Sequence, residues 1–143
     1  MFRDILVAID GSETAQRALE AGGELAEALN SRLTIIAVAP QVPPYAYRAG
    51  VDVGALEEEA SKETEKFLRE AVESLPEELP VTTVMKKGHA GERIVEQLRG
   101  GQHDLLAMGS RGRGRVATSL FGSVGAYVHY HSRIAMLVIH PED

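Results

Sequence analysis

Short apolar runs alternate along the chain with longer segments whose apolar positions recur at a helical period. Continuous apolar runs end at residues 9, 38, 108 and 139, and they define strands over 4–9, 33–38, 104–108 and 134–139. Such runs are typical of strands buried on both faces of a parallel sheet. A fifth run, over 81–85, is partly polar, which favours a position at the sheet edge.

Between these strands, apolar residues spaced three and four apart predict amphipathic helices over 15–29, 53–75 and about 90–99. A further helix is expected to start within 119–123 and to run to about residue 129. Ser12 is placed to cap the first helix. Three prolines and a glycine indicate a loop over 40–52. The alternation of strands with helices predicts one α/β domain, with a mostly parallel sheet covered by helices on both faces.

Sheets of this kind bind ligands beyond the carboxyl ends of their strands, where the strand order switches. The first and fourth strands end at Asp10 and Gly109. From Gly109 the chain reads Gly-Ser-Arg-Gly-Arg-Gly-Arg, and Gly122-Ser123 follows near the start of a helix. Glycine turns expose backbone N–H groups, and a helix N-terminus adds more donors, so this segment predicts a polyphosphate site. Its candidate ligands beyond Gly109 are Ser110, Arg111, Gly112, Arg113, Gly114, Arg115, Gly122 and Ser123.

The segment has alternative interpretations. A surface loop whose glycines only make turns is the structural alternative. A Walker A motif is excluded, because none of the four lysines completes it. The arrangement Gly112-x-Gly114-x-x-Ala117 imitates a dinucleotide fingerprint, but no acidic residue follows it before Glu142 to bind a ribose.

Composition and charge exclude several kinds of site and partner. The chain has 143 residues, no cysteine and a net charge of −6, which argues against disulfides, Cys-based zinc sites and nonspecific nucleic-acid binding. Between Asp104 and Glu142 there is no acid, but there are four arginines, which favours a discrete anion site. With no signal peptide in Met-Phe-Arg-Asp and no run long enough to span a membrane, we expect a cytoplasmic protein.

Catalytic and metal-binding residues are not assigned. His129 and His131 lie two apart on a predicted helix and point in different directions, which argues against a metal site. Ser, His and Asp are present, but there is no Gly-x-Ser-x-Gly elbow. Asp10 is the one carboxylate placed in the site, and its structural alternative is a turn and cap residue.

The spacing Gly109-x2-Gly112-x9-Gly122-Ser123 resembles the nucleotide-binding signature of the universal stress protein family. The resemblance extends over nearly the whole chain, including Ile-Leu-Val-Ala-Ile-Asp-Gly-Ser at 5–12 and Asp-Leu-Leu-Ala-Met-Gly-Ser-Arg-Gly at 104–112. It implies one domain over 1–143, a three-layer α/β sandwich with a five-stranded parallel sheet in the order 3-2-1-4-5. This is the adenine nucleotide α-hydrolase-like architecture, with ATP at the carboxyl edge.

The resemblance also implies roles for individual residues. Asp10 matches the family's ribose and adenine position, with Ala8 and Ile9 beside it, and Val38 matches the position that faces the adenine. The remaining matches are at the start and end of the phosphate segment: Met108, Gly109, Gly112, Gly122, Ser123 and Val124. One departure is Ala135, which stands where the family commonly has a proline at the start of its last strand.

These observations favour an ATP-binding, nucleotide-dependent stress-response module with at most slow ATP hydrolysis. ADP or AMP are alternatives to ATP, and Mg²⁺ is expected with the triphosphate. The resemblance implies a homodimer through the last strand, and a regulated protein partner is a further expectation; neither nucleic acid nor a membrane is expected as a partner. The rival hypotheses are a nucleotide-free dimeric scaffold and a true nucleotide hydrolase.

Overall fold

A computed structural model describes residues 1–110 and 122–142 of the chain. Its strands form one five-stranded sheet in the order β3-β2-β1-β4-β5, and every pairing is parallel. This confirms the α/β class and the strand order expected from the sequence, including the edge position of the partly polar third strand. The strands are β1 (Asp4–Ile9), β2 (Arg32–Pro40), β3 (Val81–Gly88), β4 (Leu105–Gly109) and β5 (Ala135–Ile139).

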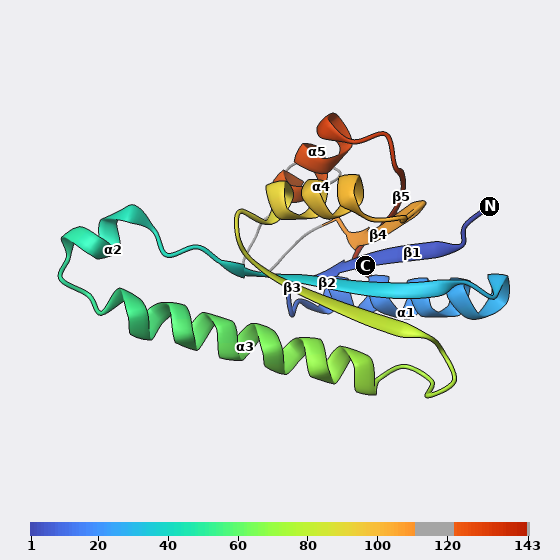
Figure 1. Cartoon of the computed structure of the whole chain (residues 1–143), viewed down its shortest axis with the longest axis horizontal. Coiled ribbons are helices and arrows are strands. Elements are labelled where there is room, and N and C mark those ends of the chain that lie inside the picture. Colours follow the sequence, from blue (N-terminus) through green and yellow to red (C-terminus); the bar gives the residue numbers. More distant parts are fainter. Residues whose placement is uncertain (111–121, 143) are drawn as a thin grey trace.

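Helices cover both faces of the sheet, as the alternation of elements predicts. Figure 1 shows α1 and α3 on one face and α4 and α5 on the other. Ser12 caps α1, as expected, by accepting a hydrogen bond from Ala15 N at 3.2 Å. The helices are α1 (Glu13–Leu29), α2 (Pro44–Arg48), α3 (Val53–Glu73), α4 (Ala90–Gly100) and α5 (Gly122–His131).

Two apolar layers result, because successive strand side chains point to opposite faces of the sheet. Val7, Ile35 and Ala107 pack in the layer on the α1 and α3 side. Leu6 and Ile36, their neighbours on β1 and β2, pack in the layer on the α4 and α5 side. The continuous apolar runs of the sequence therefore supply both layers at once.

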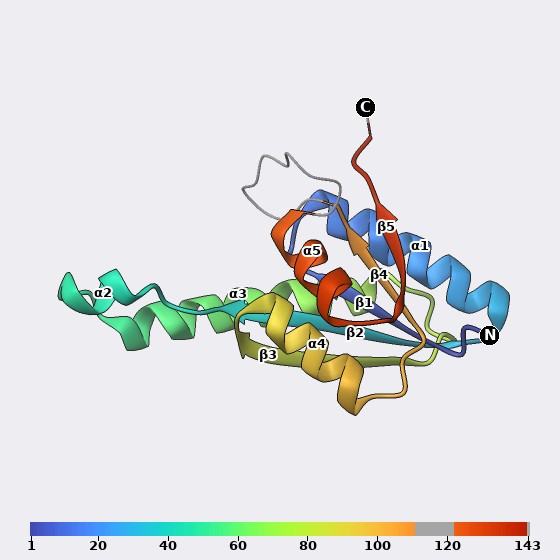
Figure 2. The same ribbon diagram turned by 90° about the horizontal axis from the view of Figure 1, so that it is seen from above.

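Three elements differ from the expectation: β2 and β3 continue past their predicted ends, and the predicted loop contains a helix. Strand β3 continues three residues past the predicted end, because its backbone stays paired with β2 as far as Gly88, opposite Pro40. The predicted loop contains the short helix α2, which Pro44 opens at a position where its missing N–H costs nothing. With the first part of α3, this helix projects beyond the end of the sheet (Figures 1 and 2).

Polar contacts fasten the amino ends of β1 and β4. The Asp104 carboxylate accepts hydrogen bonds from the backbone N–H groups of Arg3 and Asp4. His103 Nδ1 lies 3.0 Å from Asp4 Oδ1, and both side chains are largely buried. These contacts tie the amino end of β4 to that of β1, next to it in the sheet. Over the described residues, no helix is long and apolar enough to cross a membrane.

Candidate functional site

The candidate site lies at the carboxyl ends of β1 and β4, which are neighbours in the centre of the sheet. From β1 the chain crosses to β2 on one side, and from β4 it crosses to β5 on the other. This is the switch in strand order at which a parallel sheet leaves a crevice. The predicted residues Asp10, Gly109 and Ser110 directly follow or end these two strands.

The turn after β1 aims the start of α1 at this edge. Asp10 Oδ1 accepts a hydrogen bond from Ser12 N at 3.0 Å, and Gly11 between them has a φ of 83°. This φ lies in the left-handed region, where glycine carries no steric cost. Asp10 therefore has the turn-stabilising role of the structural alternative, and the half-buried carboxylate also lies at the site edge. The first turn of α1 adds backbone N–H groups that favour an anion.

The end of β4 is fixed by close packing. A Cβ built at Gly109 would lie 2.7 Å from Thr14 Cγ2, so a side chain here would collide with the first turn of α1. The next residue, Ser110, is 3% exposed, and its N–H donates to the carbonyl of Ile139 on β5 at 2.8 Å. A glycine is thus required at 109 by helix packing, whether or not a ligand is present.

The start of α5 returns to the same place. Gly122 has a φ of 68°, and a Cβ built on it would lie 3.1 Å from the carbonyl oxygen of Ser110. The two ends of the glycine-rich segment, at 109–110 and 122–124, are thereby brought together. Arg111, Gly112, Arg113, Gly114 and Arg115 lie outside the described residues. The predicted phosphate cradle is therefore described at its two ends.

Four of the predicted residues meet on one face of the sheet. Ala8, Val38, Met108 and Val124 all belong to, or pack against, the apolar layer under α4 and α5. They form an apolar wall next to the carboxyl edge, of the kind that accepts a nucleobase. Ile9 is different, because its side chain is in the layer on the α1 and α3 side. Any role of Ile9 in this site falls to its backbone. Ser123 is exposed at the start of α5.

Two residues that the sequence did not single out belong to this edge. Thr14 fills the space that the missing side chain of Gly109 leaves. Lys86 is the register partner of Val38 on β3, so its half-buried side chain shares the face of that residue. Neither had a signal in the sequence: Thr14 is one of several polar residues on α1, and Lys86 lay beyond the predicted end of its strand.

No group of three or more His, Cys, Asp or Glu in the described ranges could hold a metal ion. The described edge therefore offers backbone hydrogen-bond donors, an apolar wall and the carboxylates of Asp10 and Glu13. Donors beside an apolar wall are chemically suited to an anion attached to a flat apolar group.

Comparison with known sequences identifies relatives over the full length. The model of the universal stress protein family matches residues 1–140. A Thermus aquaticus protein, the universal stress protein in QAH/OAS sulfhydrylase 3'region, is 29% identical over 123 residues, covering 86% of this chain and 88% of its own. The Bacillus subtilis universal stress protein YxiE is 27% identical over 147 residues, which is 97% of this chain and 99% of its own.

Solved structures give the same fold. Hypothetical protein MJ0577 superposes with a TM-score of 0.85 at 22% identity, over 100% of this chain and 99% of its own. A universal stress protein in complex with cAMP gives 0.72 at 26% identity, over 99% of both chains. One from Archaeoglobus fulgidus, in complex with dAMP, gives 0.67 at 18% identity, over 96% and 98%.

Proposed function

This chain belongs to the universal stress protein family, and from that premise we propose that it binds an adenine nucleotide at the carboxyl edge of β1 and β4. The observation that carries the proposal is the convergence of Gly109, Ser110 and Gly122 at the capped start of α1. The phosphate segment named in the sequence begins and ends at that point. We further propose that the protein acts as a nucleotide-dependent regulatory module in a stress response.

The geometry supports a division of labour within the site. Backbone N–H groups at the start of α1, and in the glycine-rich segment, favour the phosphates. The wall of Ala8, Val38, Met108 and Val124 favours the flat base, and we assign the Asp10 carboxylate, directly after β1, to accept from a ribose hydroxyl. The universal stress protein that was solved with cAMP supports an adenine nucleotide as the ligand class.

Binding is favoured over fast catalysis. Asp10 is the one predicted carboxylate at the edge, and its Oδ1 already accepts the Ser12 N–H. A general base must reach the attacking water, and the other acidic side chain at the start of α1, Glu13, is exposed to solvent. We expect Mg²⁺ to arrive on the triphosphate, held mostly by phosphate oxygens and water.

The direct test is to denature the purified protein and identify the released small molecules by mass spectrometry. The stripped protein is then titrated by calorimetry with ATP, ADP, AMP and cAMP. We expect an adenine nucleotide in the release and at least one measurable affinity. A folded protein that releases no nucleotide and binds none of the four would overturn the proposal.

The arginines of the phosphate segment provide a prediction of moderate size. Replacing Arg111, Arg113 or Arg115 singly with Ala should weaken ATP binding wherever that side chain contacts phosphate. A charge-assisted hydrogen bond contributes about 1.5–3 kcal/mol, and the loss should shrink at high salt if the contact is exposed. Titrations at two salt concentrations measure both effects. Wild-type affinity in all three variants would remove the arginines from the site.

We also propose a homodimer through β5, which is an edge strand of the sheet. Ala135, which opens the strand, is exposed, and Met136, Leu137, Val138 and Ile139 are only half-buried. An unpaired apolar edge of this kind favours pairing with a second copy.

Val138→Lys should therefore shift the protein from dimer to monomer in sedimentation velocity, while the circular dichroism spectrum stays native. Loss of the native spectrum in the variant would instead place Val138 in the monomer core. A wild-type chain that remains monomeric at high micromolar concentration contradicts the dimer.

A further inference from the structure

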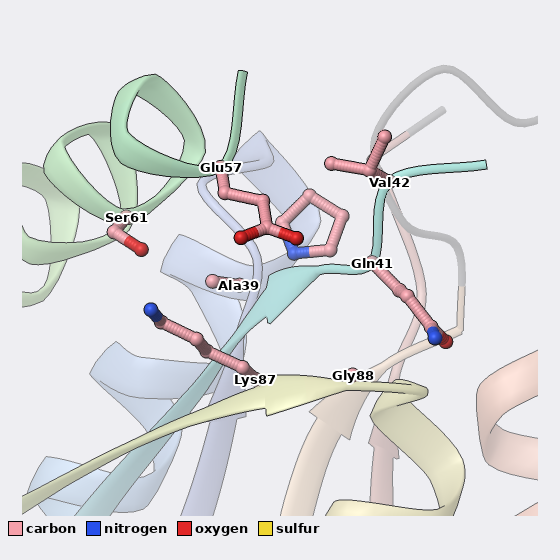
Figure 3. Close-up of a pocket in the computed structure, with 8 residues that line it drawn as sticks. Ala39, Gln41, Val42, Glu57, Ser61, Lys87 and Gly88 are labelled. Carbon is pink, nitrogen blue, oxygen red and sulfur yellow. The ribbon is translucent and has the colours of Figure 1, made fainter. Parts of the chain in front are cut away.

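A pocket of about 230 Å³ opens at the carboxyl ends of β2 and β3 (Figure 3). It lies between these strand ends, the chain that follows β2, and α3. It is on the α3 face of the sheet, whereas the apolar wall of the proposed nucleotide site is on the α4 and α5 face. The residues that line it are Ala39, Pro40, Gln41, Val42, Glu57, Ser61, Lys87 and Gly88.

The alternation of strand side chains directs Lys87 into this pocket. Met85, two residues earlier on β3, packs in the apolar layer under α3, so Lys87 points to the same face. Ala39 follows Ala37 of that layer in the same way on β2. The pocket thus lies directly beyond the apolar layer under α3, where the strands end and polar residues replace apolar ones.

Two opposite charges face the pocket from different elements. Lys87 enters from β3, and Glu57 enters from α3 (Figure 3). Over the described residues, neither side chain takes part in an ion pair, although Glu58, next to Glu57 on α3, pairs with Lys62 at 3.2 Å. Both residues are exposed, so the rim of the pocket carries one ammonium and one carboxylate that the fold does not pair with each other.

A buried hydroxyl at the pocket also lacks a partner. Ser61 Oγ is inaccessible to solvent and makes no hydrogen bond, even though a serine within a helix commonly bonds back to a carbonyl four residues earlier. Figure 3 shows this hydroxyl and the Lys87 ammonium turned toward the same space. Buried polar groups are nearly always satisfied by protein, water or a ligand, so the Ser61 hydroxyl has hydrogen-bonding capacity that the fold itself does not use.

From this arrangement we infer that the pocket binds a small zwitterion of the α-amino acid class. Lys87 attracts a simple anion, but Glu57 repels it. A simple cation is attracted by Glu57 and repelled by Lys87. A molecule that carries both charges is attracted by both side chains. The volume is below the range of about 300–1,000 Å³ that suits drug-sized ligands, and it fits a molecule of a few heavy atoms.

Each part of the ligand has a partner. Lys87 and the Ser61 hydroxyl donate to the ligand carboxylate, and Glu57 accepts from its ammonium. Ala39, Pro40 and Val42 offer an apolar surface to its side chain, and Val42 is only 8% exposed. A small aliphatic amino acid satisfies all three contacts.

The test uses L-valine and two analogues that each lack one charge. Isobutylamine is valine without the carboxylate, and 3-methylbutanoate is valine without the ammonium. In NMR titrations of the ¹⁵N-labelled full chain, valine should shift the amide signals of Ala39, Gln41, Val42, Lys87 and Gly88, with a Kd on the order of 1 mM. Each analogue should bind at least about tenfold more weakly, which is about 1.4 kcal/mol.

Matched variants identify the side chains responsible. Lys87→Met and Glu57→Gln should each weaken valine binding at least about tenfold, whereas Lys62→Met and Glu58→Gln, on α3 but outside the pocket lining, should not change it. ATP titrations of all four variants should match wild type, so this test is independent of the nucleotide proposal. Absence of shifts at Ala39, Gln41 and Val42, equal binding of an analogue, or equal losses in the control variants would each overturn the assignment.

Discussion

Gly122→Val is expected to weaken ATP binding by more than about 100-fold while the chain stays folded. The φ of 68° at this position lies in the left-handed region, which β-branched residues avoid. A Cβ here would also lie 3.1 Å from the Ser110 carbonyl, so the start of α5 must move away from the end of β4. Both changes displace the backbone donors on which the proposed phosphate site depends. Calorimetric titration with ATP measures the effect.

Gly50→Val is the matched control. Gly50 has a φ of 71°, close to that of Gly122, but a Cβ at Gly50 has no neighbour within 4 Å. The substitution therefore carries the same kind of backbone strain, about 1–3 kcal/mol, far from the proposed site. It should lower the melting temperature and leave ATP affinity unchanged. Wild-type affinity in a folded Gly122→Val variant would remove Gly122 from the phosphate site.

The central strands were predictable from sequence because each is buried on both faces. Residues 5–9 and 105–108 contain no polar residue, so neither face of these strands is expected to contact solvent. A run of this kind fits few structures other than a central parallel strand. The end of the edge strand β3 was harder to predict. Lys86 and Lys87 are charged, so the apolar pattern stops before the backbone pairing with β2 does. Strand β3 extends to Gly88 because its backbone stays paired with β2, and a side-chain pattern does not reveal backbone pairing.

The position of the candidate site was predictable from the sequence, but the structural reasons for its individual residues were not. The topology brings Asp10, Gly109 and Gly122 to one edge, as the strand order required. The reason for glycine at 109, however, is contact with Thr14, and that contact depends on how closely α1 packs against β4. Helix-to-sheet distance is a tertiary property. Ile9 was misjudged in a similar way. It is next to Asp10 in the sequence, but its side chain lies on the face of the sheet opposite the apolar wall.

That close packing of α1 leads to the largest expected effect on stability, at Gly22. A Cβ built on Gly22 would lie 2.6 Å from Val7 Cγ2, with Leu33 Cδ1 and Ala107 Cβ just beyond. The three contacts come from β1, β2 and β4, so Gly22 is where the helix touches the middle of the sheet. Val7 is fully buried and its branched side chain has one stiff rotamer, so it cannot turn aside.

Gly22→Leu should therefore lift α1 from the sheet and lower the free energy of unfolding by about 3 kcal/mol, the upper part of the usual range for overpacking. Urea denaturation followed by circular dichroism measures it. Gly100→Leu is the matched control, because a Cβ at Gly100 has no neighbour within 4 Å, and its effect should stay within about 0.5 kcal/mol. Because α1 also carries Ser12 and Thr14 to the carboxyl edge, the surviving folded fraction of Gly22→Leu should bind ATP more weakly than the control does. Equal unfolding midpoints in the two variants would show that α1 does not depend on glycine for its distance from the sheet.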